Sequence, residues 1–341
     1  MSLKIKEITQ EQLQKFYTTF PQEKTFLQSG KYGLWREEIG EKIMYLGIFQ
    51  NETMVGTALI QLITSRLKKV FHCPHGPLLL MEYQKSGLNT FLQYYKKLGI
   101  QWKCDLVRIS PLIQLQSTTG EFLEKEFTEQ HFKPATVHLI NPELTWVLNI
   151  TGSEDEILKN MKKSTRYEVK KGLKSGIEVT MGNQSKDLDI FWSLHEATVK
   201  RQGFNPFPRS QTEKQLKSLG GDCQIFNATI EQHNYSSAVI IFDEQSAFYH
   251  QGASEYCKLP ASHATLWSAI LEAKKRGCTE FNFWGVSPAD NSKHPWHGLS
   301  KFKRGFGGEE REYLHVHDYE ITGKAKLNRL IEWYRKKKRK Y

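Results

Sequence analysis

The chain has 341 residues, of which 39% are hydrophobic and 12% aromatic, and it carries a formal net charge of +11. The length predicts two domains, and the hydrophobic content excludes wholesale disorder. The net charge favours a polyanionic partner and leaves three classes open: nucleic acid, a phosphate-bearing substrate, or an anionic membrane face.

The cysteine content and the hydropathy of the chain indicate where in the cell the protein works. The five cysteines are scattered, odd in number and without C-x-x-C spacing, which argues against a disulfide framework or a zinc site. No secretory signal is visible at the amino terminus, and no apolar run approaches the ~20 residues of a membrane span. We therefore expect a cytoplasmic protein that is also able to contact the inner face of a membrane.

Two stretches of the chain repeat one order of elements: hairpin, helix, glycine stop, strand. In the first half we predict a helix at Glu11–Thr19, a segment leading into strands at Phe26–Trp35, a hairpin of Met44–Phe49 and Val55–Ile63, a loop at His72–Pro77, a helix at Leu88–Leu98 and a strand at Leu106–Ile109. In the second half we predict a hairpin of Ile225–Ile230 and Ser237–Phe242, a strand at Ala247–Gln251, a helix at Leu266–Lys275 and a strand at Glu280–Trp284. The doubled order indicates two related α/β domains, each with a mixed sheet.

A basic segment separates the two copies. Ser153 and Glu156 form a capping-box pattern that starts a helix predicted over Glu154–Lys174. Cations at spacings of three and four make a strip along about three turns of it, either as a solvated face or as an anion-binding surface; they are Lys159, Lys162, Lys163, Arg166 and Lys170. The tail Trp333–Tyr341 is also basic, and a free terminus, an RNA anchor and a contact with acidic lipid all remain compatible with it.

The stretch at 281–308 changes from an aromatic strand to a turn and then to a short helix, Leu299–Phe306. Phe302 and Phe306 lie on one side of that helix, and Lys303 and Arg304 stand between them. No phosphate-binding loop, dinucleotide fingerprint, H-E-x-x-H or G-x-S-x-G motif occurs, so neither a cofactor nor a metal is expected. The remaining chemistry is cationic, which suits the stabilisation of an oxyanion or of phosphates.

Several motifs, in order along nearly the whole chain, resemble the Fem family of peptidoglycan-bridge peptidyltransferases, which use aminoacyl-tRNA. The most specific are LSKFKRGFGGEEREY and MKKSTRYEVKKG; FLQSGKYGLWRE, HGPLLL, LVRISP and AFYHQGAS support them. The resemblance implies two acetyltransferase-like (GNAT-type) domains of the α/β (α+β) class. The first comprises residues 1–147 and 318–341, with a returning C-terminal helix, and the second residues 148–317. The chain lacks a long helical arm and so looks like the compact, FemX-like members.

The resemblance also implies the reaction. An amino acid esterified to tRNA passes to an amine on the stem peptide of a peptidoglycan precursor, either UDP-N-acetylmuramoyl pentapeptide or lipid II. A monomer is expected, with aminoacyl-tRNA and the precursor as partners. The family's catalytic cation corresponds to Lys303, with Phe302 beside it. We also hypothesise that the basic strip binds tRNA.

The resemblance also implies residues that contact the precursor. The implied contacts are Arg36, at a basic position that binds the precursor's phosphates, and Arg209, Tyr249 and His250. Ser110 departs from the family, which commonly has Asp in this R-I-D-P motif, and the change bears on acceptor specificity. Two other readings stay open: an acyl-CoA-dependent N-acyltransferase of the same fold, and a non-catalytic RNA-binding protein.

Overall fold

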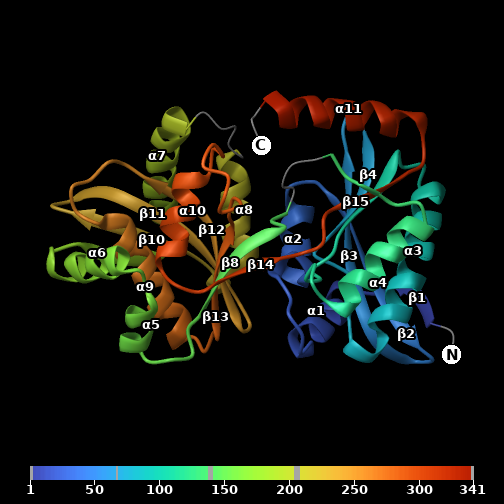
Figure 1. Ribbon diagram of the computed structural model, residues 1–341, viewed down its shortest axis with the longest axis horizontal. Helices are drawn as coiled ribbons and strands as arrows, with labels where there is room; N and C mark the ends of the chain where they lie inside the picture. Colours follow the sequence, from blue (N-terminus) through green and yellow to red (C-terminus); the bar gives the residue numbers. More distant parts are fainter. Residues whose placement is uncertain (1–2, 67, 137–140, 203–207, 339–341) are drawn as a thin grey trace. The chain divides into compact units, whose positions relative to one another are not determined.

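The computed structural model describes residues 3–66, 68–136, 141–202 and 208–338. The chain forms two compact units, of which unit 1 comprises Met1–Glu143 with Glu312–Tyr341 and unit 2 comprises Leu144–Arg311 (Figure 1). The boundaries expected at 147/148 and 317/318 lie a few residues later than these. The first boundary lies earlier because the whole strand Leu144–Asn149 pairs within the sheet of unit 2. The second lies earlier because Leu314 packs in the core of unit 1 and the strand that begins at His317 pairs within its sheet.

Unit 1 is a mixed sheet with helices on both faces. Its elements are β1 (Leu3–Glu7), α1 (Gln10–Thr19), η1 (Phe26–Gln28), α2 (Gly30–Glu38), β2 (Lys42–Gln50), β3 (Thr53–Thr64), β4 (Lys69–Pro74), β5 (Leu78–Leu79), η2 (Met81–Tyr83), α3 (Gln84–Gln101), β6 (Leu106–Ser110), α4 (Thr118–Glu129), β7 (Lys133–Pro134), β15 (His317–Glu320) and α11 (Gly323–Lys338). The strand order is β1-β2-β3-β4-β6-β15-β7, and β5 pairs with β3. The pair β4–β6 is parallel and is connected through α3.

Alternation along the strands divides the side chains of unit 1 between two layers. One face packs Leu46, Ile60 and Phe71 against Phe91 of α3 and Phe127 of α4. The other face carries polar side chains that bond to neighbouring helices. Gln61 of β3, for example, donates to the hydroxyl of Tyr32 on α2 at 2.8 Å.

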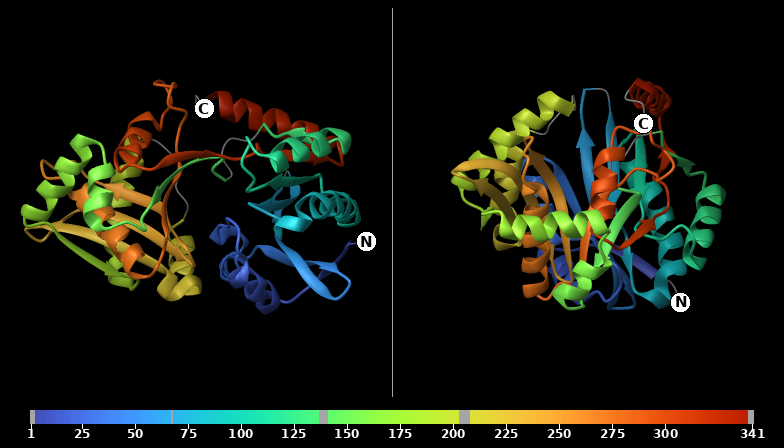
Figure 2. Two further views of the ribbon diagram at one scale, coloured as in Figure 1. Left: turned by 60° about the horizontal axis from the view of Figure 1, so that its bottom comes forward. Right: turned by 60° about the vertical axis from the view of Figure 1, so that its left-hand side comes forward.

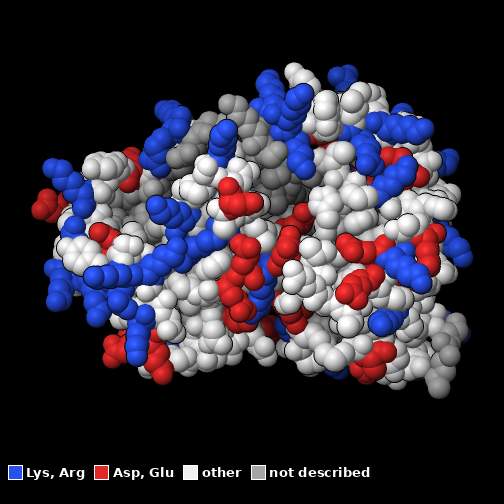
Figure 3. Space-filling view, viewed as in Figure 1, with Lys and Arg blue, Asp and Glu red and all other residues white. Residues whose placement is uncertain are grey.

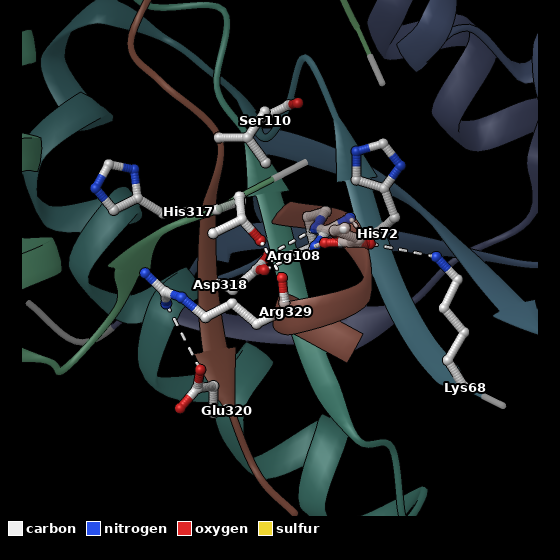
Figure 4. A network of polar contacts seen from close by, with 12 residues as sticks. Lys68, His72, Arg108, Ser110, His317, Asp318, Glu320 and Arg329 are labelled. Atoms are coloured by element: carbon white, nitrogen blue, oxygen red, sulfur yellow. Dashed lines mark hydrogen bonds and ion pairs between the residues drawn. The ribbon is translucent and has the colours of Figure 1, made fainter. Parts of the chain in front are cut away.

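A buried ion cluster fixes α11 to unit 1 (Figure 4). Arg108 of β6 is 2% exposed and donates to both carboxylate oxygens of Asp318 on β15, at 2.6 and 2.7 Å. It also donates to both carboxylate oxygens of Glu332 on α11, at 3.2 and 2.9 Å. Lys68 lies 3.5 Å from the same Glu332 carboxylate. The C-terminal helix expected to return to the first domain is therefore held there by a guanidinium shared between two carboxylates.

Unit 2 repeats the plan with its own mixed sheet. Its elements are β8 (Leu144–Asn149), α5 (Glu154–Asn160), α6 (Lys163–Lys174), β9 (Glu178–Gly182), α7 (Ser185–Gln202), α8 (Arg209–Leu219), η3 (Gly220–Asp222), β10 (Cys223–Ile230), β11 (His233–Asp243), β12 (Ser246–Ser254), α9 (Ala261–Lys275), β13 (Glu280–Gly285), α10 (His297–Gly305) and β14 (Glu309–Glu312). The strand order is β14-β8-β13-β12-β11-β10-β9. The pair β12–β13 is parallel and is connected through α9.

The sheet of unit 2 is covered on both faces, by α9 on one and α7 on the other (Figures 1 and 2). Phe226 and Ile240 share a buried cluster with Trp267 of α9. Asn227, the next residue along β10, points to the opposite face and donates to the Asp187 carbonyl of α7. The expected fold class, an α/β protein with two related mixed-sheet domains, is confirmed.

The segment predicted to lead into strands, residues 26–35, forms η1 and the first part of α2, and β2 follows it. The N-cap of α2, Ser29, accepts a bond from the Tyr32 N–H at 3.1 Å. Two local predictions are wrong. Residues 72–74 of the predicted loop belong to β4. The helix expected over Glu154–Lys174 is two helices, α5 and α6, although the predicted capping box at Ser153 is present.

The break between α5 and α6 has a tertiary cause. Met161 has an extended backbone and a side chain buried in the core of unit 2. The next N–H, of Lys162, donates to the Gly305 carbonyl of α10 at 2.9 Å instead of to a carbonyl one turn back. Periodicity in the sequence cannot reveal a bond to a residue so distant along the chain.

The basic tail forms the end of α11 up to Lys338, and residues 339–341 lie outside the described part of the chain. None of the helices in the described segments is both long enough and apolar enough to cross a membrane.

The Arg108 cluster yields a stability prediction. Arg108→Met leaves two buried carboxylates without their shared cation, so it should lower the free energy of unfolding by about 3–5 kcal/mol in urea denaturation. The matched control is Arg209→Met, which removes an exposed pair with Asp189 and should cost no more than about 1 kcal/mol. Equal effects of the two substitutions would show that the buried cluster does not hold the fold.

Candidate active site

A buried lysine occupies the inner side of α10. Lys303 is only 5% exposed, and burial lowers the pKa of its ammonium to about 7. Its Nζ donates a hydrogen bond of 2.7 Å to the carbonyl oxygen of Gly285. Within the described parts of the chain this ammonium has no carboxylate partner. Two of its three N–H donors are therefore available to another acceptor.

The Gly285 carbonyl is placed by an irregularity in β13. The pairing of β13 with β8 shifts between Asn282 and Gly285, so one extra residue is accommodated there. Trp284 adopts a φ of 65°, and its N–H bonds to the Asn282 side chain at 2.8 Å. A bulky aromatic residue rarely has a positive φ, and such strain is concentrated at functional sites. The bulge turns the end of β13 toward Lys303.

The two parallel strands of unit 2 separate at this place. Register pairing between β12 and β13 ends at Phe248 and Asn282, although both strands continue. The Lys303 ammonium contacts both separated ends, because it bonds to Gly285 and lies 5.6 Å from the ring centroid of Tyr249 on β12. In unit 1 the equivalent pair β4–β6 stays in register to its last residues. Among the residues that the structure describes, only those of unit 2 thus combine separated parallel strands with a buried cation between them.

Tyr249 is fixed by a bulge and by a glycine. The pairing of β11 and β12 shifts so that His250 is the extra residue next to Tyr249. A Cβ at Gly252 would lie 1.8 Å from the Tyr249 hydroxyl, so no larger residue fits beneath that ring. Burial raises the pKa of Tyr249 to about 12, which keeps its hydroxyl protonated and able to donate.

Aromatic side chains secure α10 to the core. The Phe302 ring meets His263 of α9 at 5.0 Å and Phe306 at 5.4 Å between centroids. Phe306 is fully buried. Phe302 thus contributes to the packing that orients α10, and through the helix it helps to direct Lys303.

The two most specific sequence motifs pack against each other. A Cβ at Gly305 would lie 2.2 Å from the Thr165 hydroxyl of α6, so the helices approach closely there. Gly307 has a φ of 85°, and a Cβ on it would lie 2.8 Å from the Asn160 carbonyl. Gly305 and Gly307 of FKRGFGG are therefore required by contact with α5 and α6, whereas a Cβ at Gly308 would meet the backbone of β8. This contact joins the helix that carries Lys303 to the basic segment.

The basic segment is exposed in unit 2, and Figure 3 shows Lys and Arg side chains gathered over α5 and α6. Lys159 lies on α5, Lys162 is the N-cap of α6, and Lys163, Arg166 and Lys170 lie on α6. Arg166 donates to the Lys159 carbonyl at 2.9 Å and so bridges the break. The strip thus spans two helices and not three turns of one.

Two further residues of α6 extend the strip and were not identified from the sequence. Lys174 continues the spacing of four from Lys170 on the same side of the helix, a signal that was available. Tyr167, 63% exposed, lies among these cations. An exposed aromatic ring among cations offers a stacking surface to a nucleobase; no sequence pattern singled it out.

The remaining predicted site residues make contacts of their own. Arg36 on α2 forms a bidentate pair with Glu41 and stacks on Trp35, so its guanidinium is already engaged. Ser110, at the end of β6, is buried and accepts a bond from Asn141 at 3.2 Å. Arg209 begins α8 and pairs with Asp189.

Of the predicted residues, Lys303 and Tyr249 lie close together in unit 2, and His250 follows Tyr249 along β12, whereas Arg36 and Ser110 belong to unit 1. Among the residues that the structure describes, no group of three or more His, Cys, Asp or Glu side chains is arranged to hold a metal ion.

The buried ammonium gives a prediction that is independent of activity. In [13C]lysine-labelled protein, the Lys303 Cε resonance, identified by its loss in Lys303→Met, should titrate near pH 7 and not near 10.5. Because the folded pKa is the lower one, burial of the charge opposes folding fully below pH 7, and less as pH rises to 10.5. Any stability advantage of Lys303→Met should therefore shrink across that window by about 1.4 kcal/mol per pH unit. Parallel stability curves, or titration near 10.5, would mean that the ammonium is hydrated.

Comparison with known proteins adds the family. The model of the FemAB family matches residues 8–237 and 208–332. The lipid II:glycine glycyltransferase of Staphylococcus epidermidis is 22% identical over 309 residues, covering 70% of this chain and 74% of that protein. The lipid II:glycine glycyltransferase of Staphylococcus haemolyticus is 22% identical over 321 residues, covering 73% of this chain and 76% of that protein.

Solved structures agree in fold. The crystal structure of FemX superposes with a TM-score of 0.82 at 18% identity, over 96% of this chain and 100% of that one. A tandem GNAT protein from the clavulanic acid pathway gives a TM-score of 0.58 at 10% identity, over 94% of this chain and 98% of that one. These likenesses establish the tandem acetyltransferase-like fold, and the family model covers nearly the whole chain. The chain belongs to the FemAB family.

Proposed function

We propose that this protein is an aminoacyltransferase that passes an amino acid from aminoacyl-tRNA to the stem-peptide amine of a peptidoglycan precursor. Membership of the FemAB family, with relatives named lipid II:glycine glycyltransferases, supports amino-acid transfer in cross-bridge synthesis. The single observation that supports a catalytic role for Lys303 is its buried ammonium, which lies between separated parallel strands. One of its N–H groups donates to the Gly285 carbonyl, and the other two remain available to a substrate.

The proposed reaction is an aminolysis. The acceptor amine attacks the ester carbonyl of the aminoacyl-tRNA, a C–N bond forms, and the carbonyl oxygen becomes an oxyanion. The C–O bond to the ribose then breaks, and the proton lost by the amine balances the one gained by the ribose hydroxyl. Lys303 donates to the oxyanion, and the Gly285 carbonyl keeps the ammonium directed. A buried cation acts strongly on such a charge because little water screens it.

The backbone N–H groups at the start of α9 favour a tRNA ester over acyl-CoA as the donor. CoA-dependent enzymes of this fold bind pyrophosphate on free N–H groups at a helix start. In α9, the N–H groups of Ala261 and His263 bond to the carbonyls of Leu259 and Pro260, at 2.9 and 3.1 Å. Pro260 itself has no N–H. The exposed cations and Tyr167 on α6, by contrast, suit a tRNA.

Lys303→Met should abolish transfer. Loss of an oxyanion donor typically lowers kcat by about 100- to 1,000-fold, and the fold should persist because Met fills a similar volume. The measurement is radiolabel passing from aminoacyl-tRNA pools to UDP-linked and lipid-linked precursors. Lys301→Met, at an exposed lysine of the same helix, is the matched control and should keep near-normal turnover. Substantial activity in Lys303→Met would remove this residue from the mechanism.

The basic segment should bind tRNA. Lys163→Glu with Lys170→Glu should weaken tRNA binding and reduce the slope of log Kd against log salt by about two, one for each lost phosphate contact. Arg166 is left intact because it bridges α5 and α6. Lys186→Glu with Lys275→Glu, exposed elsewhere in unit 2, makes the same charge change as a control. If both pairs weaken binding equally, the segment is a solvated face.

A non-catalytic RNA-binding protein would pass the binding test and fail the transfer test. Turnover of aminoacyl-tRNA by the unmodified protein therefore separates the two functions.

A further inference from the structure

The helix α11 packs on unit 1 with its polar side. Ala325 and Asn328 are buried, and Glu332, one turn further along, accepts bonds from Arg108. The Arg329 carbonyl accepts a bond from Thr136 at 3.0 Å. The residues that face the protein are thus small or polar.

The opposite side of α11 is apolar and exposed. Leu327, Leu330 and Tyr334 are 55%, 60% and 60% exposed, and Trp333 beside them is 49% exposed. The spacing of three and four residues aligns the first three in one stripe, about half a turn away from Glu332. A helix on a globular domain normally buries its apolar stripe and exposes its charges. Here that arrangement is reversed, so the apolar stripe lacks a cover in unit 1.

Cations flank the stripe. The exposed ones are Lys324, Lys326, Arg335, Lys337 and Lys338. Within the helix Gly323–Lys338 the one acidic residue is Glu332, and it is turned inward to Arg108 and Lys68. Figure 3 shows Lys and Arg side chains together with uncharged ones along α11. The exposed side of α11 therefore combines apolar and cationic groups without a carboxylate.

We propose that this exposed side of α11 docks on an anionic membrane surface. Leucines enter the acyl boundary, Trp and Tyr prefer the headgroup level, and flanking lysines attract anionic lipids. Pairing with a second copy of α11 would bring two rows of cations together. A nucleic acid would satisfy the cations and leave the leucines in water. The bilayer matches both kinds of side chain at once.

The inference rests in one respect on the proposed function: docking would give the enzyme a lipid-linked acceptor in place of a freely diffusing one. The binding itself requires no catalysis. The two can therefore be tested separately.

The test is co-sedimentation of the full chain with vesicles. The unmodified protein should bind vesicles containing phosphatidylglycerol and should not bind pure phosphatidylcholine. Leu327→Gln with Leu330→Gln should weaken binding at least about tenfold, because the apolar insertion is lost while every cation remains. The matched control is Met81→Gln with Ile100→Gln, two exposed apolar residues elsewhere in unit 1. Thermal unfolding of all variants should stay close to that of the unmodified protein, since these side chains are exposed.

Several outcomes would overturn the proposal: no binding of the unmodified protein to anionic vesicles, equal losses in test and control variants, or a dimer in light scattering that only the α11 variant disrupts. Loss of tRNA affinity in the α11 variant with vesicle binding intact would instead assign the surface to RNA. With transfer as the readout, the α11 variant should keep turnover on the UDP-linked precursor and lose it on lipid-linked precursor in vesicles. Failure of the unmodified protein to transfer to either acceptor, with vesicle binding intact, would refute the proposed function and leave the docking surface standing.

Discussion

The bond from the Lys303 ammonium to the Gly285 carbonyl is the interaction on which the site depends. An ammonium is rarely buried without a carboxylate, because desolvation of the charge is costly. The surrounding structure maintains it through two irregular strands: a bulge in β13 directs the carbonyl, and a bulge in β12 positions Tyr249. The fold thus accepts an unfavourable buried charge at one place. The buried charge is unfavourable in the free protein, and a negative charge that develops beside it would stabilise it.

The two units share one topology, but the buried cation in each unit has different partners. In unit 1 the parallel strands β4 and β6 stay paired, and the cation Arg108 between layers is neutralised by Asp318 and Glu332. In unit 2 the parallel strands separate, and the Lys303 ammonium between them has N–H groups that remain available to another acceptor. A fully paired guanidinium secures a helix, whereas a partly paired ammonium can bind a ligand. The two cations therefore differ in their partners and not in the topology that carries them.

The exposed basic residues on α6 and α11 also differ in the side chains that surround them. On α6 the cations surround an exposed tyrosine, which favours a nucleic acid. On α11 they flank a leucine stripe, which favours a lipid surface. The net charge of +11 is therefore the sum of surfaces with different chemistry. Counting charges predicts polyanionic partners, but only the apolar neighbours distinguish between them.

The sequence alone determined the doubled hairpin–helix–strand order, the capping box at Ser153 and the cationic character of the site, because these depend on local periodicity and on residue type. The family motifs also singled out Lys303. The tertiary structure decided what local patterns cannot encode: the break at Met161, the burial that lowers the Lys303 pKa, the bidentate engagement of Arg36 and the outward leucines of α11. Each of these follows from a contact between residues whose positions are fixed by packing, or from which side of a helix the protein covers. The sequence records the side chains, and only the fold determines which of them meet water.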